Sequence, residues 1–255
     1  MFIVDSHCHL DALDYENLHK DIADVVTKAN ARDVKHLLAI GVTLSRFEKA
    51  YPELAKFPNV SLACGVHPLD LEEEPYDADR LLRLSQDKKV IAIGEIGLDY
   101  HYGKENRDEQ IILFKKQLDL ASELNLPVVI HSRDATKDTV DILKNYSLNG
   151  VIHCFSGSLE IAKEYIKMGF LLGIGGVVTF KNSKLPLVVK EIPLESIVLE
   201  TDSPYLTPTP YRGSVNSSKY IPIIAEKIAE IKEISTSEVA SVTTNNALKL
   251  FDLGK

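Results

Sequence analysis

Two histidines stand one residue apart near the start of the chain, within FIVDSHCHLD at positions 2–11. This stretch is typical of a β-strand, in which successive side chains point to opposite faces. His7 and His9 therefore share one face, while Cys8 takes the other. Because histidine is a common metal ligand, two imidazoles on one face could hold a metal ion. A chain with 8 histidines can also contain such a pair by chance, so the motif needs support from other residues.

The elements that would position this pair follow from the hydrophobic pattern. Short apolar runs recur along the chain, and the segments between them carry apolar residues at three- and four-residue steps. The eight runs lie at residues 2–6, 36–42, 60–66, 90–97, 127–132, 150–157, 170–176 and 196–202, and the helical segments include 18–29, 111–124, 161–166, 217–233 and 236–251. Most runs are continuously apolar, as expected for parallel strands that are buried on both faces.

Eight strands that alternate with helices in 255 residues predict an α/β fold, a (β/α)8 TIM barrel. We expect a single domain over residues 1–255, because the sequence contains no linker, low-complexity tract or short repeat. A doubly wound open sheet is the second candidate. It would have to account for GIGG at 173–176, which lacks the full dinucleotide fingerprint and lies far from the first strand.

The composition narrows the class of protein. A hydrophobic content of 45% suffices for a large core, yet no stretch approaches the roughly 18 apolar residues of a membrane span. We find no signal peptide, and Cys8, Cys64 and Cys154 are too scattered for a disulfide framework, so we expect a cytoplasmic protein. The net charge of −8 argues against a broad nucleic-acid-binding surface, although divalent ions in a cleft would reverse the local sign. We expect a monomer with no membrane contact and no obligate protein partner.

Further polar residues occupy the positions where a barrel does its chemistry, the carboxyl ends of its strands. Besides His7 and His9, the strand ends carry Glu95, His131, His153 and Asp202. Any one of them could be an ordinary hydrogen-bonded residue or mark a turn. Burying so many polar groups together is costly unless something pairs with them, and a metal centre supplies that pairing. The sequence therefore predicts a metal site at the barrel mouth.

The ligand set also restricts the metal. Imidazole and carboxylate suit Zn, Mn, Fe, Co or Ni, whereas a carboxylate-only set would suit Mg or Ca. Four histidines and two carboxylates exceed the needs of one four-coordinate ion, so two ions bridged by Glu95 fit better. The predicted cofactor is thus two divalent metal ions, with Zn, Mn, Co, Ni and Mg all retained as candidates. Cys8 and Cys154 each stand next to a histidine, so the alternation of a strand turns them toward the helices. We expect both to be small buried hydrophobic residues.

The motifs taken together resemble those of the TatD family of metal-dependent deoxyribonucleases, within the amidohydrolase-like barrels. The resemblance runs from Phe2 to about Phe251. It rests on DSHCHLD, GVHP, GEIGLDY, PVVIHSRDA, HCFSG and ETDSPYL, in the order and spacing of that family. HxH alone would be a weak signal, but the six motifs together are specific.

This resemblance implies a two-metal hydrolase with an assigned ligand set. One ion would be held by His7, His9, Glu95 and Asp202, and the second by Glu95, His131 and His153. His67, in GVHP, matches a family histidine that lies near the substrate, outside the direct metal ligands. Glu95 would take the bridging place that a carbamylated lysine fills in some related barrels.

Several neighbours could support the chemistry. Asp202 could hold a metal and the proton of the attacking water, and Glu200 shares its side-chain parity. We count Asp202, Glu95 and Glu200 as the candidate catalytic residues, although Glu200 could instead support a ligand histidine or fill the barrel interior. Which carboxylate acts as general base stays open.

Candidate substrate contacts are weaker. Arg133 shares parity with His131 and could clamp a phosphate oxygen, or it could pair with Asp134. The remaining candidates are Arg212 in the loop after strand eight, and Asp99, Tyr100 and His101 after Glu95, which could line the cleft or pack within their loop.

Three functions are compatible with these residues. The leading prediction is a deoxyribonuclease that cleaves DNA phosphodiester bonds, exonucleolytically or on single strands, with a water activated by two metal ions. The second is a metal-dependent hydrolase of amide or ester bonds in a small metabolite, since fold and metals do not separate the two. The third is a metal-stabilised binding protein without catalysis.

Overall fold

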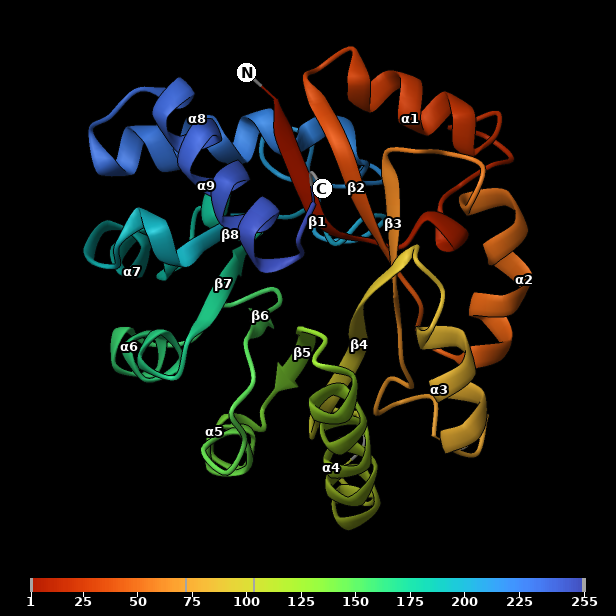
Figure 1. Ribbon diagram of the computed structural model, residues 1–255. Coiled ribbons are helices and arrows are strands. Elements are labelled where there is room, and N and C mark those ends of the chain that lie inside the picture. The colour runs from red at the N-terminus through yellow and green to blue at the C-terminus, as the bar shows by residue number, and fades with distance from the viewer. Residues whose placement is uncertain (1, 72, 103, 254–255) are drawn as a thin grey trace.

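The strands form one parallel sheet in chain order, as Figure 1 shows at the centre of the molecule. The computed structural model describes residues 2–71, 73–102 and 104–253. The strands within these ranges are β1 (Ile3–Cys8), β2 (Val34–Ile40), β3 (Val60–Cys64), β4 (Val90–Asp99), β5 (Val128–Arg133), β6 (Gly150–Ile152), β7 (Phe170–Ile174) and β8 (Ile197–Leu199). Cys8 forms a parallel bridge with Ser203, just beyond β8, so the sheet nearly closes on itself. The predicted (β/α)8 barrel is confirmed, and the open sheet is wrong.

Helices surround this barrel and cover the outer face of its strands (Figure 1). They are α1 (Ile22–Asn30), α2 (Leu44–Leu54), α3 (Ala78–Ser85), α4 (Arg107–Leu124), α5 (Thr136–Leu143), α6 (Leu159–Lys167), α7 (Leu185–Glu191), α8 (Ile221–Lys232) and α9 (Thr236–Leu250), with short 3-10 helices at Leu10–Ala12, Gly176–Thr179, Leu194–Ser196 and Ser218–Tyr220. Several begin with an oxygen-bearing side chain that accepts a backbone N–H of the first turn, as Asp21, Thr43 and Ser158 do. Within the described ranges, no helix combines the length and apolar character that crossing a bilayer requires.

Two apolar layers explain why the strands read as continuous apolar runs. The larger layer lies between strands and helices, while the smaller one fills the barrel interior. The interior layer comprises Val4, Leu38, Ile40, Ala63, Ala92, Val129, Val151, Val198, Ala247 and Phe251. Since both faces of each strand are buried, the polar residues at the carboxyl ends stand out against an apolar barrel.

Irregularities in two strands decide which side chains reach the mouth. The pairing of β1 with β2 shifts register between Asp5 and Cys8, and that of β4 with β5 shifts between Ile93 and Ile96. An extra residue in one strand reverses the alternation of faces beyond it. His7 can therefore face the mouth although Val4, three residues earlier, faces the barrel interior. A strictly alternating strand would not place both residues inside.

The glycines of GIGG serve close packing rather than nucleotide binding. A Cβ added at Gly173 would collide with the Glu200 carboxylate, and one at Gly176 would collide with the backbone oxygen of Leu206. The missing side chains therefore leave room for a buried carboxylate and for the loop after β8.

Candidate metal centre

The predicted metal ligands converge at the carboxyl ends of the strands. They come from β1 (His7 and, just beyond it, His9), β4 (Glu95), β5 (His131), the residue after β6 (His153) and the segment after β8 (Asp202). Most of them line a cleft of about 590 Å³, and His7 lies fully buried directly beneath it. All six predicted ligands are thus brought together, although Asp202 lies three residues past the end of its short strand.

Four of these residues form a compact first group. His7 Nε2 lies 3.2 Å from His9 Nε2, 3.4 Å from Glu95 Oε2 and 3.6 Å from Asp202 Oδ1. His9 Nε2 lies 3.7 Å from Glu95 Oε2 and 3.4 Å from Asp202 Oδ1. A tetrahedral ion with bonds of about 2.0–2.2 Å separates its ligand atoms by about 3.3–3.6 Å. The spacing of the four atoms fits such an ion.

A second group gathers around the other oxygen of the same glutamate. Glu95 Oε1 lies 2.9 Å from His131 Nδ1, 3.2 Å from His153 Nε2 and 3.6 Å from His67 Nε2. His67 was expected near the substrate only, yet it lies as close to Glu95 as the histidines of the first group do. Glu95 thus directs one oxygen into each group, which is the arrangement of a bridging carboxylate.

The chemistry of these atoms suits a divalent cation. Histidine ring nitrogens and carboxylate oxygens point at one another in a buried space, where a divalent cation can satisfy several lone pairs at once. The residues present therefore fit a metal ion in each group.

Both carboxylates of the centre are held in the ionised form. Burial alone would raise the pKa of Glu95, but the charges of the surrounding histidines, led by His153, hold it well below its usual range. Burial also opposes ionisation of Asp202, yet the hydrogen bond from His9 and the neighbouring histidine charges lower its pKa. Ionised carboxylates are the form that coordinates metal.

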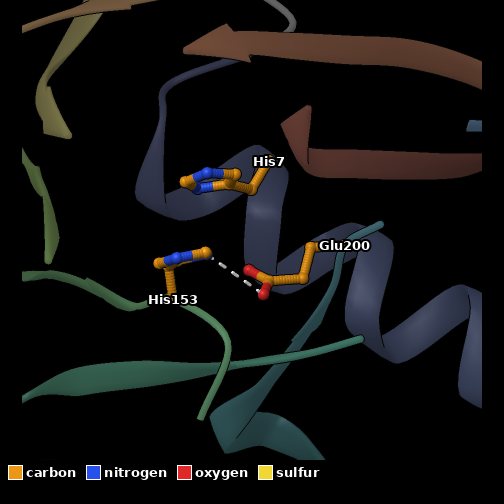
Figure 2. A group of neighbouring side chains, drawn as sticks. All are labelled: His7, His153 and Glu200. Atoms are coloured by element: carbon orange, nitrogen blue, oxygen red, sulfur yellow. Dashed lines mark ion pairs between the residues drawn. The ribbon is translucent and has the colours of Figure 1, made fainter. Parts of the chain in front are cut away.

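Glu200 supports the ligand histidines from below. Figure 2 shows the His7 and His153 rings stacked, with the Glu200 carboxylate beside them. The ring centroids lie 3.8 Å apart, and Glu200 Oε1 lies 3.4 Å from His153 Nδ1. The same oxygen accepts the backbone N–H of Cys154 at 2.6 Å. Glu200 is fully buried and is not among the described residues that line the cleft, so its position suits it to orient His153.

Replacing Glu200 with glutamine is expected to lower metal affinity and turnover about 10- to 100-fold, the usual cost of losing a partner of a ligand histidine. Gly173→Ala should act in the same direction, because its new methyl group occupies the space of the Glu200 carboxylate. Metal content at a fixed free-metal concentration and kcat/KM measure the effect. The matched control is Glu226→Gln, on the exposed side of α8. Metal retention and turnover equal to wild type in both variants would contradict this support.

Two carboxylates have supporting roles that the sequence did not predict: Asp5 was not singled out, and Asp99 was considered only as a residue that could line the cleft. Asp5 is fully buried and accepts the backbone N–H and hydroxyl of Thr201 at 3.0 and 2.7 Å, which ties β1 to the segment that carries Asp202. Burial raises the pKa of Asp5 to about 7. Asp99 Oδ2 lies 3.0 Å from His131 Nε2 and holds that ring against Glu95. The available signal was a carboxylate inside an apolar run, which is costly unless it is paired.

Of the predicted substrate contacts, the structure places some in the cleft and others within their loops. Arg133 is exposed and lines the cleft, with its guanidinium 4.8 Å from the Tyr102 ring centre. Asp134, the alternative partner considered for Arg133, pairs instead with His101 at 2.9 Å. No ion pair to Arg133 is found among the described residues. Tyr100 packs within its loop, where its hydroxyl donates to Asp138 at 2.7 Å.

Arg212 and the cysteines take no direct part in the cleft. Arg212 donates to the backbone oxygen of Thr207, lies over the Phe180 ring and is absent from the described residues that line the cleft. Burial raises the thiol pKa of Cys8 and Cys154, which disfavours the thiolate form needed for ligation. The expectation that they behave as buried hydrophobic residues agrees with this for Cys8, whereas Cys154 keeps partial exposure.

Known proteins share this arrangement over nearly the full chain. The family described as TatD related DNase matches residues 4–252. The chain belongs to the TatD-related DNase family. Membership of the TatD family confirms the resemblance carried by the six sequence motifs.

Individual TatD relatives cover the whole barrel. The Escherichia coli K12 protein named uncharacterized metal-dependent hydrolase YcfH is 43% identical over 257 residues, which span 99% of this chain and 97% of its own. The human protein named deoxyribonuclease TATDN3 is 38% identical, over 98% of this chain and 94% of its own. The crystal structure of YJJV, a TatD homolog from Escherichia coli K12, has a TM-score of 0.92 at 28% identity, over 99% and 98% of the two chains.

Proposed function

We propose that this TatD-family protein is a divalent-metal-dependent hydrolase that cleaves phosphodiester bonds of DNA. The observation that carries the proposal is the placement of Glu95, whose two oxygens face two separate groups of histidines. Paired sites of this kind suit in-line displacement at phosphorus, because they stabilise both the attacking and the leaving oxygen. The name of the human relative, deoxyribonuclease TATDN3, supports DNA as the substrate class.

His7, His9, Glu95 and Asp202 would hold one ion, and Glu95, His131 and His153 the other. Bound there, divalent ions would lower the pKa of water to about 7 and offset charge on the phosphate.

The chain's own groups divide the remaining tasks. Asp202 directs Oδ1 at the ligand histidines while its side chain stays 14% exposed on the cleft, so it can also accept a proton from the attacking water. Glu95 is less suited to this, since its side chain is only 4% exposed and both oxygens face histidines. Glu200 orients His153 and does not touch the substrate.

Arg133 is positioned to hold the phosphate. Its planar guanidinium lies over the Tyr102 ring at the cleft and is not paired with a carboxylate among the described residues. A guanidinium in this state can donate two parallel hydrogen bonds to phosphate oxygens. The acidic chain offers few other cations in the cleft, and Arg46 is already paired with Asp11 at 2.9 Å. Binding should therefore be confined to a few phosphates.

Replacing Arg133 with alanine is expected to lower kcat/KM on end-labelled single-stranded DNA about 10- to 100-fold, since a hydrogen bond to a charged group contributes about 1.5–3 kcal/mol. Metal content should not change, because Arg133 does not face the ligand atoms. The dependence of binding on salt should be shallow, as its slope scales with the number of phosphates contacted. The matched control is Arg83→Ala, an exposed arginine of α3 that pairs with Glu48.

A substrate screen of the metal-loaded protein accompanies this comparison. It covers single-stranded DNA, duplex DNA, RNA, and simple esters and amides. If every nucleic acid stays intact while a small amide or ester is cleaved, the nuclease proposal is wrong and the metabolite hydrolase replaces it. If nothing is cleaved, the non-catalytic binding protein becomes the better account.

A further inference from the structure

Two exposed tyrosines stand at the rim of the cleft. Tyr102 and Tyr205 are 65% and 57% exposed, although an aromatic ring is normally buried to a greater degree. Leu69, 38% exposed, joins them on the same rim. Among the described residues, three of the seven exposed large hydrophobic side chains thus gather at this one cleft. Such a concentration of exposed apolar surface is typical of a binding site.

The two rings flank the metal centre from opposite sides. Tyr205 follows β8, and its ring centre lies 6.1 Å from that of His9, which follows β1. Tyr102 follows β4, and the guanidinium of Arg133, at the end of β5, lies over its ring. In a sheet that closes in the order β1 to β8, the β8–β1 seam lies across the barrel from the β4–β5 pair. A substrate lying over the ligand residues would therefore pass one ring on each side.

The backbone of each tyrosine is anchored while its ring remains available. The N–H of Tyr102 donates to Asp99 Oδ1 at 3.1 Å, and that of Tyr205 donates to the backbone oxygen of Asp202 at 2.8 Å. Neither hydroxyl forms a hydrogen bond within the described ranges, in contrast to Tyr15 and Tyr100, whose hydroxyls hold their loops. The fold therefore fixes the position of each tyrosine through its backbone and leaves the ring exposed to a ligand.

We propose that Tyr102 and Tyr205 stack against the two bases that flank the cleaved phosphodiester, so that the substrate is an unpaired strand. Tyr205 receives the base on the His9 side, and Tyr102 the base on the Arg133 side. Every base offers a flat face to an aromatic ring, so this binding tolerates any sequence. In a duplex the bases are paired and stacked on one another, and their faces do not reach the rings. This inference rests on the proposed phosphodiesterase function and adds the two side chains that would contact the bases.

The test uses Tyr102→Leu and Tyr205→Leu, with Tyr102→Phe and Tyr205→Phe as matched controls that keep the ring and remove the hydroxyl. The substrates are one short end-labelled DNA strand, two versions with an abasic residue on one side of the cleaved bond, and a version abasic on both sides. Metal content is measured for every variant. On the intact strand each leucine variant should lose about 5- to 150-fold in kcat/KM, mainly through KM, and each phenylalanine variant should stay near wild type.

The abasic strands assign each ring to its base. Removing the base on one side should abolish the loss in kcat/KM of one leucine variant and leave that of the other. The version that is abasic on the other side of the cleaved bond should reverse this pattern. On the doubly abasic strand both leucine variants should equal wild type. This last comparison also separates stacking from support of Arg133, because a penalty that acts through Arg133 would persist without bases.

Equal penalties of the leucine variants on intact and doubly abasic strands would overturn the base contacts. So would cleavage of duplex DNA at the rate of a single strand of the same sequence. Failure of the underlying function looks different. In that case the wild-type protein would cleave no strand with any substrate design, while its metal content stayed normal.

Discussion

Replacing Glu95 with glutamine is expected to reduce turnover by three orders of magnitude or more and to lower the metal content below two ions per chain. The substitution keeps the size of the side chain but removes its charge and replaces one oxygen with an NH₂ group that cannot ligate a metal. Because the two oxygens face different histidine groups, at 3.4 Å from His7 and 2.9 Å from His131, one group loses its oxygen outright. A loss of about 4 kcal/mol in charge stabilisation corresponds to about 10³ in rate.

Elemental analysis alongside kcat makes this test specific to bridging. Glu226→Gln, an exposed change on α8, is the control for loss of a glutamate charge. His9→Ala should disturb the first group mainly, because the predicted ligands that His9 contacts all belong to that group. His7 is a less selective probe, since its ring also stacks on His153 of the second group. Two tightly bound ions in Glu95→Gln would show that Glu95 does not bridge.

Exhaustive removal of divalent metal is expected to abolish hydrolysis, and adding back Mn, Co, Ni or Zn is expected to restore it. The ligand atoms belong to imidazoles and carboxylates packed 2.9–3.7 Å apart. Without a cation, these lone pairs face one another in a buried space, which is unfavourable. The melting temperature should therefore also fall on chelation, since ions that bind only the folded chain stabilise it.

The change in melting temperature provides a readout that does not depend on choosing the right substrate. In Glu95→Gln the shift caused by chelation should be smaller than in wild type, because fewer ions remain to be removed. A chelator saturated with calcium serves as the control for effects of the chelator itself. Full turnover by a preparation shown to be free of metal would rule out the two-metal mechanism.

The pattern of residues was sufficient to predict the architecture and the residues that meet at the barrel mouth. Parallel strands that are buried on both faces require continuous apolar runs, and eight such runs separated by helical segments leave few folds open. His7, His9, Glu95, His131, His153 and Asp202 stand at the ends of those runs. Since the carboxyl ends of barrel strands meet at one mouth, their convergence follows from the topology. TatD membership agrees with that assignment of the fold.

Strand ends and side-chain directions were less predictable, because they depend on pairing with neighbouring strands. The prediction treated Glu200 and Asp202 as neighbours on one strand, whereas β8 ends at Leu199. Asp202 has a φ of 55°, in the left-handed region, so alternation of faces does not govern its direction. Glu200 faces inward because Gly173, on the adjacent β7, leaves a space for its carboxylate.

The sequence by itself determined the barrel and the residues that gather at its mouth, because both follow from local periodicity and strand order. Only the tertiary structure decided how those residues are grouped and which neighbours each one contacts. It placed the two oxygens of Glu95 in separate histidine groups, brought Asp99 against His131, and left Tyr102 and Tyr205 exposed on opposite sides. These relations join residues on different strands at distances of a few ångströms. Such distances depend on register shifts and loop paths that no local pattern encodes.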